Sequence, residues 1–234
     1  MTGKIGNMSD IVTKTTKAIL LLPPECPPIR KRQTVVSRDI RKAMSVCSQC
    51  QMCTDLCPRN LIGQSIKPHE FMRAIANGLT DNVDPLLNSM FCCSCGLCEM
   101  YSCHQGLSPR KLLDEYKAGL KSKGVRVPDK PSGPVKAMRE VRKVPEHRLV
   151  YRLGLHSYDL AAPMMKYDGP VKEVKLLLRQ CIGAPVKPVV SVGDTVVEGQ
   201  LIGEVPEGAL GTCLHASIDG QVTAVNDNYI MIKS

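Results

Sequence analysis

The sequence predicts a multidomain α+β protein in which a helical, cysteine-rich module precedes a small all-β domain. Helix-forming patterns flank two runs of closely spaced cysteines. From about residue 171, short stretches rich in Val, Ile and Leu alternate with Gly-Asp, Glu-Gly and Asp-Gly turns, which is typical of β-structure. The 234 residues include no Trp and only two Phe, so one large core is not expected. Small modules stabilised in part by metal fit this composition better.

Residues 1–33 are expected to be the end of another domain followed by a linker. Residues 11–13 and 19–22 are β-rich or apolar and predict two strands, although no partner strand lies nearby in the sequence. The proline-rich segment 23–28 predicts a stiff linker. The apolar stretch 18–22 is far too short to span a bilayer, and no signal-peptide cleavage site follows it.

Four helices are expected within the cysteine-rich module, residues 34–125. Ser and Pro residues stand where helices begin, and Gly78 and Gly124 stand where two of them should end. Apolar residues at three- and four-residue spacing give each helix one buried face. The expected helices begin near Ser37, Pro68, Asp84 and Ser108.

A basic connector punctuated by prolines is expected at residues 126–170, with one helix around 147–153. The all-β domain is expected at 171–234.

Eight cysteines arranged in two runs are the most informative feature of the sequence. The first run has the spacing Cys-x2-Cys-x2-Cys-x3-Cys and is followed by Pro58, and the second has the spacing x2-x2-x4 and is followed by His104. A run of this kind places three thiolates around one iron–sulfur cluster and sends the fourth elsewhere. The runs consist of Cys47, Cys50, Cys53 and Cys57, and of Cys92, Cys95, Cys98 and Cys103.

Two runs predict two [4Fe–4S] clusters, because the fourth cysteine of each run ligates the other cluster in two-cluster ferredoxins. The x4 spacing makes Cys103 the least regular of the predicted ligands, and Cys93 is either an alternative ligand or a spare thiol. The predicted ligands are Cys47, Cys50, Cys53 and Cys103 for cluster A, and Cys92, Cys95, Cys98 and Cys57 for cluster B.

Structural zinc is the alternative for paired cysteines, and it would make the chain a non-redox scaffold. Zinc takes four ligands, typically two from each of two separate pairs, whereas three cysteines recur here at strict spacing twice. Soft thiolates with no histidine in a ligand position favour iron–sulfur clusters. The sequence therefore predicts electron transfer and no catalytic residue that makes or breaks bonds.

Charge and cysteine content limit the classes of binding partner and the cellular compartment that we expect. The net charge of +9 either attracts an acidic partner or reflects solvated basic faces. Nucleic-acid binding is not expected, because aromatic residues do not interleave with the basic ones. Twelve cysteines in repeated triplets do not resemble a secreted disulfide scaffold, so we expect a reducing, cytoplasmic compartment. Cys181 and Cys213 are expected to be buried free thiols.

The last domain carries the pattern V-x-x-G-D-x-V-x-x-G-x-x-I at residues 190–202, which resembles biotinyl/lipoyl-like barrel-sandwich domains. Gly193, Gly199 and Gly220 are expected in turns with positive φ. A carrier domain would display a lysine on the hairpin between its halves, but residues 204–214 contain none. The domain is therefore predicted to be a structural or docking module.

Together these features resemble the C subunit of the Rnf electron-transport complex and, more closely, the cobalamin reductases of propanediol-utilising bacterial microcompartments. The resemblance rests on residues 12–23, the first cysteine run with Pro58, residues 98–110 and the terminal barrel-sandwich pattern. The long connection between the runs also resembles α-helical ferredoxin modules of succinate dehydrogenase and heterodisulfide reductase. The fold class implied is an α-helical dicluster ferredoxin module followed by a barrel-sandwich domain.

The same resemblance implies that the chain is the C-terminal part of a larger NADH- and flavin-dependent reductase. FMN and NADH would bind another domain or a partner subunit, which would donate electrons to the clusters. The acceptor would be a cobalamin-handling protein or, in an Rnf-type alternative, ferredoxin at a membrane. Residues 1–33 would be the end of a β-grasp domain that binds soluble ligands, and the protein would reside in the cytoplasm or in a microcompartment. No transmembrane segment is expected.

Overall fold

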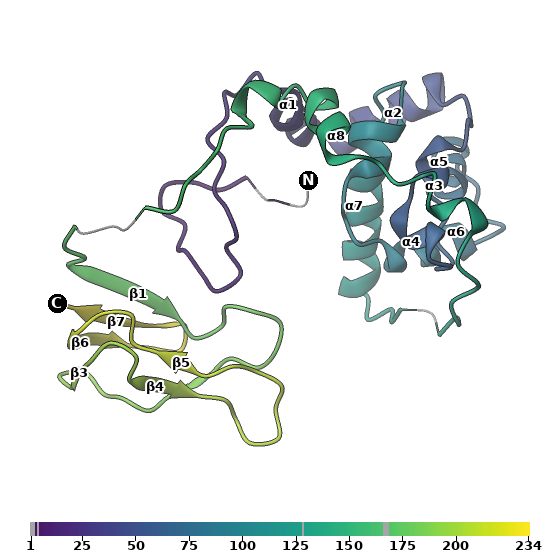
Figure 1. The fold of residues 1–234 in the computed structure, drawn as a ribbon. Coiled ribbons are helices and arrows are strands. Elements are labelled where there is room, and N and C mark those ends of the chain that lie inside the picture. Colours follow the sequence, from purple (N-terminus) through teal and green to yellow (C-terminus); the bar gives the residue numbers. More distant parts are fainter. Residues whose placement is uncertain (1–2, 4, 128, 166–168) are drawn as a thin grey trace. The chain divides into compact units, whose positions relative to one another are not determined.

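The computed structural model describes residues 3, 5–127, 129–165 and 169–234 (Figure 1). The chain divides into two compact units. The helical unit consists of Met1–Ile5 and Leu22–Ala161, and the β unit consists of Gly6–Leu21 and Ala162–Ser234.

Eight α-helices, several of them a single turn, make up the described part of the helical unit. Three 3₁₀ turns lie at Asn88–Phe91, Ala137–Arg139 and His156–Tyr158, and a π turn lies at Cys98–Ser102. The α-helices are α1 (Pro27–Gln33), α2 (Val36–Val46), α3 (Met52–Asp55), α4 (Pro58–Leu61), α5 (Pro68–Asn77), α6 (Asp84–Leu87), α7 (Pro109–Ser122) and α8 (Glu146–Arg152).

The core of the helical unit lies where α2, α5 and α7 meet (Figure 1). Phe71 and Leu113 are almost fully buried there, and Phe71 also meets the ring of Tyr116 edge-on at 5.7 Å between centroids. Burial of such side chains stabilises the unit by about 1.5–3 kcal/mol each. This small core fixes the helices that carry or flank the cysteines.

Proline and glycine set most of the helix ends as predicted. The helices α5, α6 and α7 have proline in the first turn, where the missing N–H costs no hydrogen bond. The helix α5 ends at Gly78 with φ of +63°. Ser37, however, is not the N-cap of α2, because that helix begins at Val36 and its capping position is Val35.

The two strands predicted for residues 1–33 do not form. Residues 11–13 and 19–22, which the structure describes throughout, contain no strand. Val12 and Leu20 are more than half exposed, so β propensity alone does not produce a strand where no partner strand pairs with it. At the end of the predicted proline-rich linker, Pro27 begins the helix α1.

The predicted connector is attached to the helical unit along its first half. The N–H of Gly133 donates to the Gly63 carbonyl at 2.8 Å, and the N–H of Lys136 donates to the Leu61 carbonyl at 2.9 Å. Arg142 pairs with Asp55 at 2.9 Å. Residues 133–142 of the connector therefore pack against α3, α4 and the loop that follows α4.

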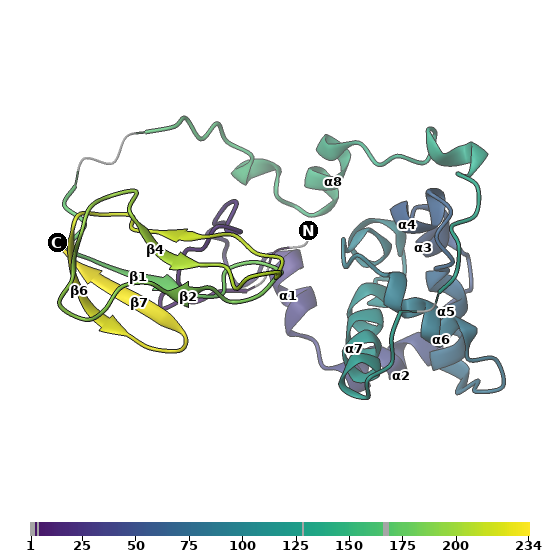
Figure 2. The same cartoon turned by 90° about the horizontal axis from the view of Figure 1, so that it is seen from below.

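The β unit contains two antiparallel sheets that do not close into a barrel (Figure 2). The larger sheet has the order β1-β7-β6-β3, and the smaller one has the order β2-β4-β5. Their apolar faces share a core that includes Ile202, Val222, Ile230 and Ile232. The strands are β1 (Glu173–Leu177), β2 (Lys187–Pro188), β3 (Thr195–Val196), β4 (Leu201–Glu204), β5 (Leu214–His215), β6 (Gly220–Val225) and β7 (Tyr229–Lys233).

Part of the N-terminal segment belongs to the β unit. The N–H of Lys14 donates to Gln180 Oε1 at 2.9 Å, and Lys14 Nζ donates to Thr212 Oγ1 at 3.4 Å. Lys14 thus contacts both the loop between β1 and β2 and the loop between β4 and β5.

The three glycines of the barrel-sandwich pattern have positive φ, as predicted. The values are +98° for Gly193, +83° for Gly199 and +157° for Gly220. At Gly220 a Cβ atom would lie 2.2 Å from the Lys233 carbonyl oxygen, whereas at Gly193 it would meet nothing within 4 Å. Gly220 is therefore required both by φ and by the close approach of β7.

We expect Gly220→Ala to destabilise the β unit by about 2–4 kcal/mol, because strain and overpacking add. Gly193→Ala is the matched control and should cost only about 1–2 kcal/mol, since it introduces strain alone. Hydrogen exchange of the β6 and β7 amides in the full chain measures both free energies of opening. Equal losses in the two variants would contradict the close-approach explanation.

Candidate iron–sulfur centres

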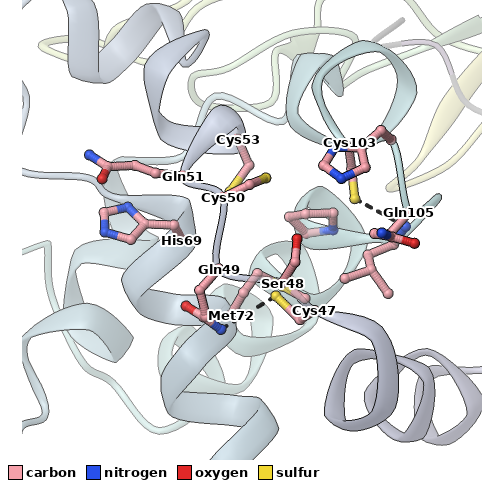
Figure 3. A pocket seen from close by; sticks show the side chains of 13 residues that line it. Cys47, Ser48, Gln49, Cys50, Gln51, Cys53, His69, Met72, Cys103 and Gln105 are labelled. Atoms are coloured by element: carbon pink, nitrogen blue, oxygen red, sulfur yellow. Dashed lines mark hydrogen bonds between the residues drawn. The ribbon is translucent and has the colours of Figure 1, made fainter.

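The first pocket is lined by the thiols of Cys47, Cys50, Cys53 and Cys103, which surround a common space (Figure 3). Its volume is about 380 Å³, part of it open to solvent. Three of these cysteines come from the loop before α3 and from α3 itself, and the fourth follows the π turn. The other lining residues are Ser48, Gln49, Gln51, His69, Met72, His104, Gln105, Leu107 and Pro109.

The second pocket has a volume of about 310 Å³ and lies beside α4 and α7. Its sulfur atoms come from the four cysteines predicted for cluster B and from Cys93, which the structure places beside them. The five cysteines are Cys57, Cys92, Cys93, Cys95 and Cys98.

Each pocket therefore combines three cysteines of one run with the last cysteine of the other. Cys103 lies with the first run and Cys57 lies with the second. This grouping of thiols is the one that the predicted exchange of ligands requires, although ligation itself stays a prediction.

Both cysteine runs fold into the same kind of loop. The second and fourth residues after the first cysteine have positive φ in each run. Left-handed backbone at these positions curls the loop so that successive cysteines face one space, and it is costly for residues other than glycine. The residues are Gln49 (+55°) and Gln51 (+63°) in the first run, and Ser94 (+58°) and Gly96 (+84°) in the second.

Several sulfur atoms accept hydrogen bonds from the protein. The N–H of Leu107 donates to Cys103 Sγ, and the N–H of Ser94 donates to Cys92 Sγ, both at 3.3 Å. Gln49 Nε2 lies 3.4 Å from Cys47 Sγ (Figure 3). Donors of this kind stabilise the negative charge that thiolate ligands bring to an iron–sulfur cluster.

Burial raises the pKa values of several of the pocket thiols. It raises the pKa of Cys53 to about 12, and the other thiols of the first pocket add to this. Burial likewise raises the pKa values of Cys92 and Cys95 to about 11 and that of Cys98 well above its usual value. Metal binding must therefore displace protons, because thiolates and not thiols are the ligands.

The donor set fits an iron–sulfur cluster. Within the described part of the chain, no three or more His, Cys, Asp and Glu side chains are grouped closely enough to hold one metal ion. The thiols instead surround two pockets, and soft thiolates are the usual ligands of such clusters.

A buried ion pair holds the second cysteine run against α7. Glu99 Oε1 accepts from Arg110 Nε at 2.9 Å and from Arg110 Nη2 at 2.6 Å, while Glu99 Oε2 accepts from the N–H of Lys111 at 3.0 Å. The Glu99 side chain is fully buried. The sequence analysis missed this role, because nothing in the spacing distinguishes a buried glutamate from an exposed one.

Three lysines that the sequence analysis also missed bind backbone carbonyls near the pockets. Lys31 and Lys42 both donate to the Gly106 carbonyl, and Lys117 donates to the Cys92 carbonyl at 2.6 Å. Burial lowers the pKa of Lys31, and the charge of Glu99 opposes that effect.

His104 and the cysteines outside the two runs are not among the predicted cluster ligands. His104 is exposed and lines the first pocket. Cys26 is buried, whereas Cys181 and Cys213 are only half-buried, so their predicted full burial is wrong.

Comparison with known proteins identifies both units. Residues 46–108 match the family described as a 4Fe-4S dicluster domain, and residues 158–234 match the RnfC barrel sandwich hybrid domain. Cobalamin reductase PduS of Salmonella typhimurium and that of Citrobacter freundii are each 38% identical to this chain over 232 residues. The terminal domain thus matches an RnfC family model, and nearly the whole chain is similar to two cobalamin reductases. This confirms the resemblance inferred from the sequence motifs.

The alignment with the two cobalamin reductases covers 99% of this chain but 51% of each relative, so the chain spans about half their length. The C subunit of the Na(+)-translocating ferredoxin:NAD(+) oxidoreductase complex of Acetobacterium woodii is 50% identical over 46 residues, which is 20% of this chain and 10% of that protein. The dicluster domain and the likeness to these redox proteins support iron–sulfur electron transfer as the function of this chain. Nothing in these comparisons supports the zinc scaffold.

Among the described residues, no helix is long and apolar enough to cross a membrane.

We expect Glu99→Ala to lower the free energy of unfolding of the helical unit by about 3–5 kcal/mol, because Arg110 loses its fully buried partner and keeps only the partly exposed Asp114, at 3.2 Å. The double variant Glu99→Gln/Arg110→Met should lose less. Anaerobic urea denaturation followed by circular dichroism measures both.

Lys67→Met is the control for this prediction, since it removes an ion pair with Glu70 that is largely exposed. It should cost at most about 0.5 kcal/mol. A Glu99→Ala loss no larger than that of the control would contradict the role of the buried pair.

Proposed function

We propose that this chain holds two [4Fe–4S] clusters and is the electron-transfer part of an NADH- and flavin-dependent cobalamin reductase. The observation that carries the proposal is the pair of pockets, each with three thiols from one cysteine run and one from the other. Cluster A would be held by Cys47, Cys50, Cys53 and Cys103, and cluster B by Cys92, Cys95, Cys98 and Cys57.

When bound, such clusters accept and release single electrons at potentials that the protein sets. The residues of this chain hold the clusters, donate hydrogen bonds to sulfur and limit access of water. The two pockets are joined by the short step from Cys53 to Cys57, whose Cα atoms can be at most about 14 Å apart in four residues. This proximity supports direct electron exchange between the two sites.

The donor and the acceptor are inferred from the relatives. Two proteins that this chain resembles over nearly its full length are named cobalamin reductases. We infer that FMN and NADH act on another domain or a partner subunit, and that a cobalamin-handling protein takes the electrons. The expected location is the cytoplasm, within a microcompartment if the chain follows the cobalamin reductases.

An Rnf-type role is the second candidate, in which the chain reduces ferredoxin as a peripheral component at a membrane. The match to the Acetobacterium woodii protein favours it, although that match covers 20% of the chain. Copurification with membrane subunits would support this role, whereas recovery in purified microcompartments would support the first.

We also infer that the barrel-sandwich domain is a biotinyl/lipoyl-like docking module without a covalent cofactor. Two glycine turns of the repeated pattern, at Gly193 and Gly199, support the likeness. The segment 204–214, which joins β4 to β5, has no lysine to modify.

The ligand assignment is tested by serine substitution. Cys50→Ser should remove the signal of one cluster, and Cys95→Ser should remove that of the other, because serine replaces a soft thiolate ligand by a hard oxygen. Electron paramagnetic resonance of the reduced protein, purified without oxygen, measures both signals.

Cys93→Ser and Cys213→Ser serve as controls and should leave both signals in place. Persistence of both clusters in Cys50→Ser or Cys95→Ser would contradict the assignment. Loss of the second cluster in Cys93→Ser would make Cys93 a ligand.

A further inference from the structure

The peptide group between Gly106 and Leu107 connects two lysines to a cysteine of the first pocket. Its carbonyl oxygen accepts hydrogen bonds from Lys31 Nζ and from Lys42 Nζ, the latter at 3.1 Å. Its N–H, which belongs to the same planar unit, donates to Cys103 Sγ at 3.3 Å. Two ammonium groups are thus linked to one predicted ligand sulfur through a single peptide.

Helices that are separate in the sequence supply the two lysines. Lys31 lies in α1 and Lys42 lies in α2. Both reach the turn after Cys103, where the N–H of Gly106 donates to the Cys103 carbonyl at 3.2 Å and Gly106 has φ of +61°. The turn is therefore held in the one orientation that aims the N–H of Leu107 at the sulfur.

This arrangement has an electronic consequence. Ammonium groups at the carbonyl oxygen polarise the peptide, so that its N–H becomes a stronger donor to sulfur. A stronger hydrogen bond to a ligand sulfur stabilises the reduced, more negative form of a cluster and raises its potential. The two positive charges act in the same direction through space.

The second pocket has a different balance of charge and burial. Lys117 binds the Cys92 carbonyl there, and Arg59 and Arg110 also line the pocket. The carboxylates of Glu99 and Asp114 pair with Arg110 at 2.6 and 3.2 Å. Cys57 and Cys98 are buried, whereas Cys50 of the first pocket is exposed. Burial disfavours the more highly charged, reduced form of a cluster.

We propose that Lys31 and Lys42 raise the reduction potential of the cluster at the first pocket. This inference rests on the proposed function, because it requires a cluster at that pocket.

The test is an anaerobic redox titration followed by electron paramagnetic resonance on the full chain. Lys31→Met/Lys42→Met should lower the midpoint potential of one cluster by at least the equivalent of a tenfold change in its reduction equilibrium, about 59 mV for one electron. The other midpoint should stay in place. The Cys95→Ser background, in which only the cluster at the first pocket is expected, identifies the cluster that shifts.

Two matched variants separate this effect from general changes of charge or packing. Lys31→Arg/Lys42→Arg keeps both positive charges and should retain most of the original midpoint. Lys121→Met removes an exposed lysine 12 residues along α7 from Pro109, about 18 Å away along the helix axis. It should change neither midpoint.

Unchanged midpoints in Lys31→Met/Lys42→Met, with iron content intact, would overturn the inference, as would a shift of the other cluster. If the double variant loses iron, the single variant Lys42→Met, at an exposed position, is titrated instead. An unchanged midpoint of the first-pocket cluster in Lys42→Met would then overturn the inference. Absence of iron and sulfide from the unaltered chain would instead overturn the proposed function.

Discussion

The exchange of Cys57 and Cys103 between the two cysteine runs is the constraint on which the helical unit depends. Neither run can complete its own pocket, because the fourth thiol of each pocket comes from the other run. The segment between the runs must therefore fold back, and α5 and α7 must pack against α2, before either site exists. We therefore expect assembly of the pockets and folding of the unit to be one event, since metal binding can supply folding free energy to a small core.

The polar contacts around the pockets follow from the same constraint. Glu99 and Arg110 fix the second run to α7, and the lysines of α1 and α2 fix the turn after Cys103. Each of these contacts joins a cysteine-bearing loop to a helix, so each both stabilises the pocket and sets charge near sulfur. Under the proposed function, stability and redox tuning therefore depend on the same residues.

Local chemistry made most of the helical unit and the grouping of the thiols predictable. Proline at helix starts and glycine at Gly78 act within one turn, and the spacing of the cysteines defines one loop. The strands expected at residues 11–13 and 19–22 do not form, because a strand depends on a partner that propensity does not supply. The contacts of Lys31 and Lys42 with Gly106 span 75 and 64 residues, a separation that spacing cannot reveal.

Quantification of iron and acid-labile sulfide in anaerobically purified protein tests the central claim most directly. Two thiol pockets that each hold a [4Fe–4S] cluster predict about eight iron atoms and about eight sulfides per chain. Zinc in their place, at about one or two atoms per chain and without sulfide, would contradict the account.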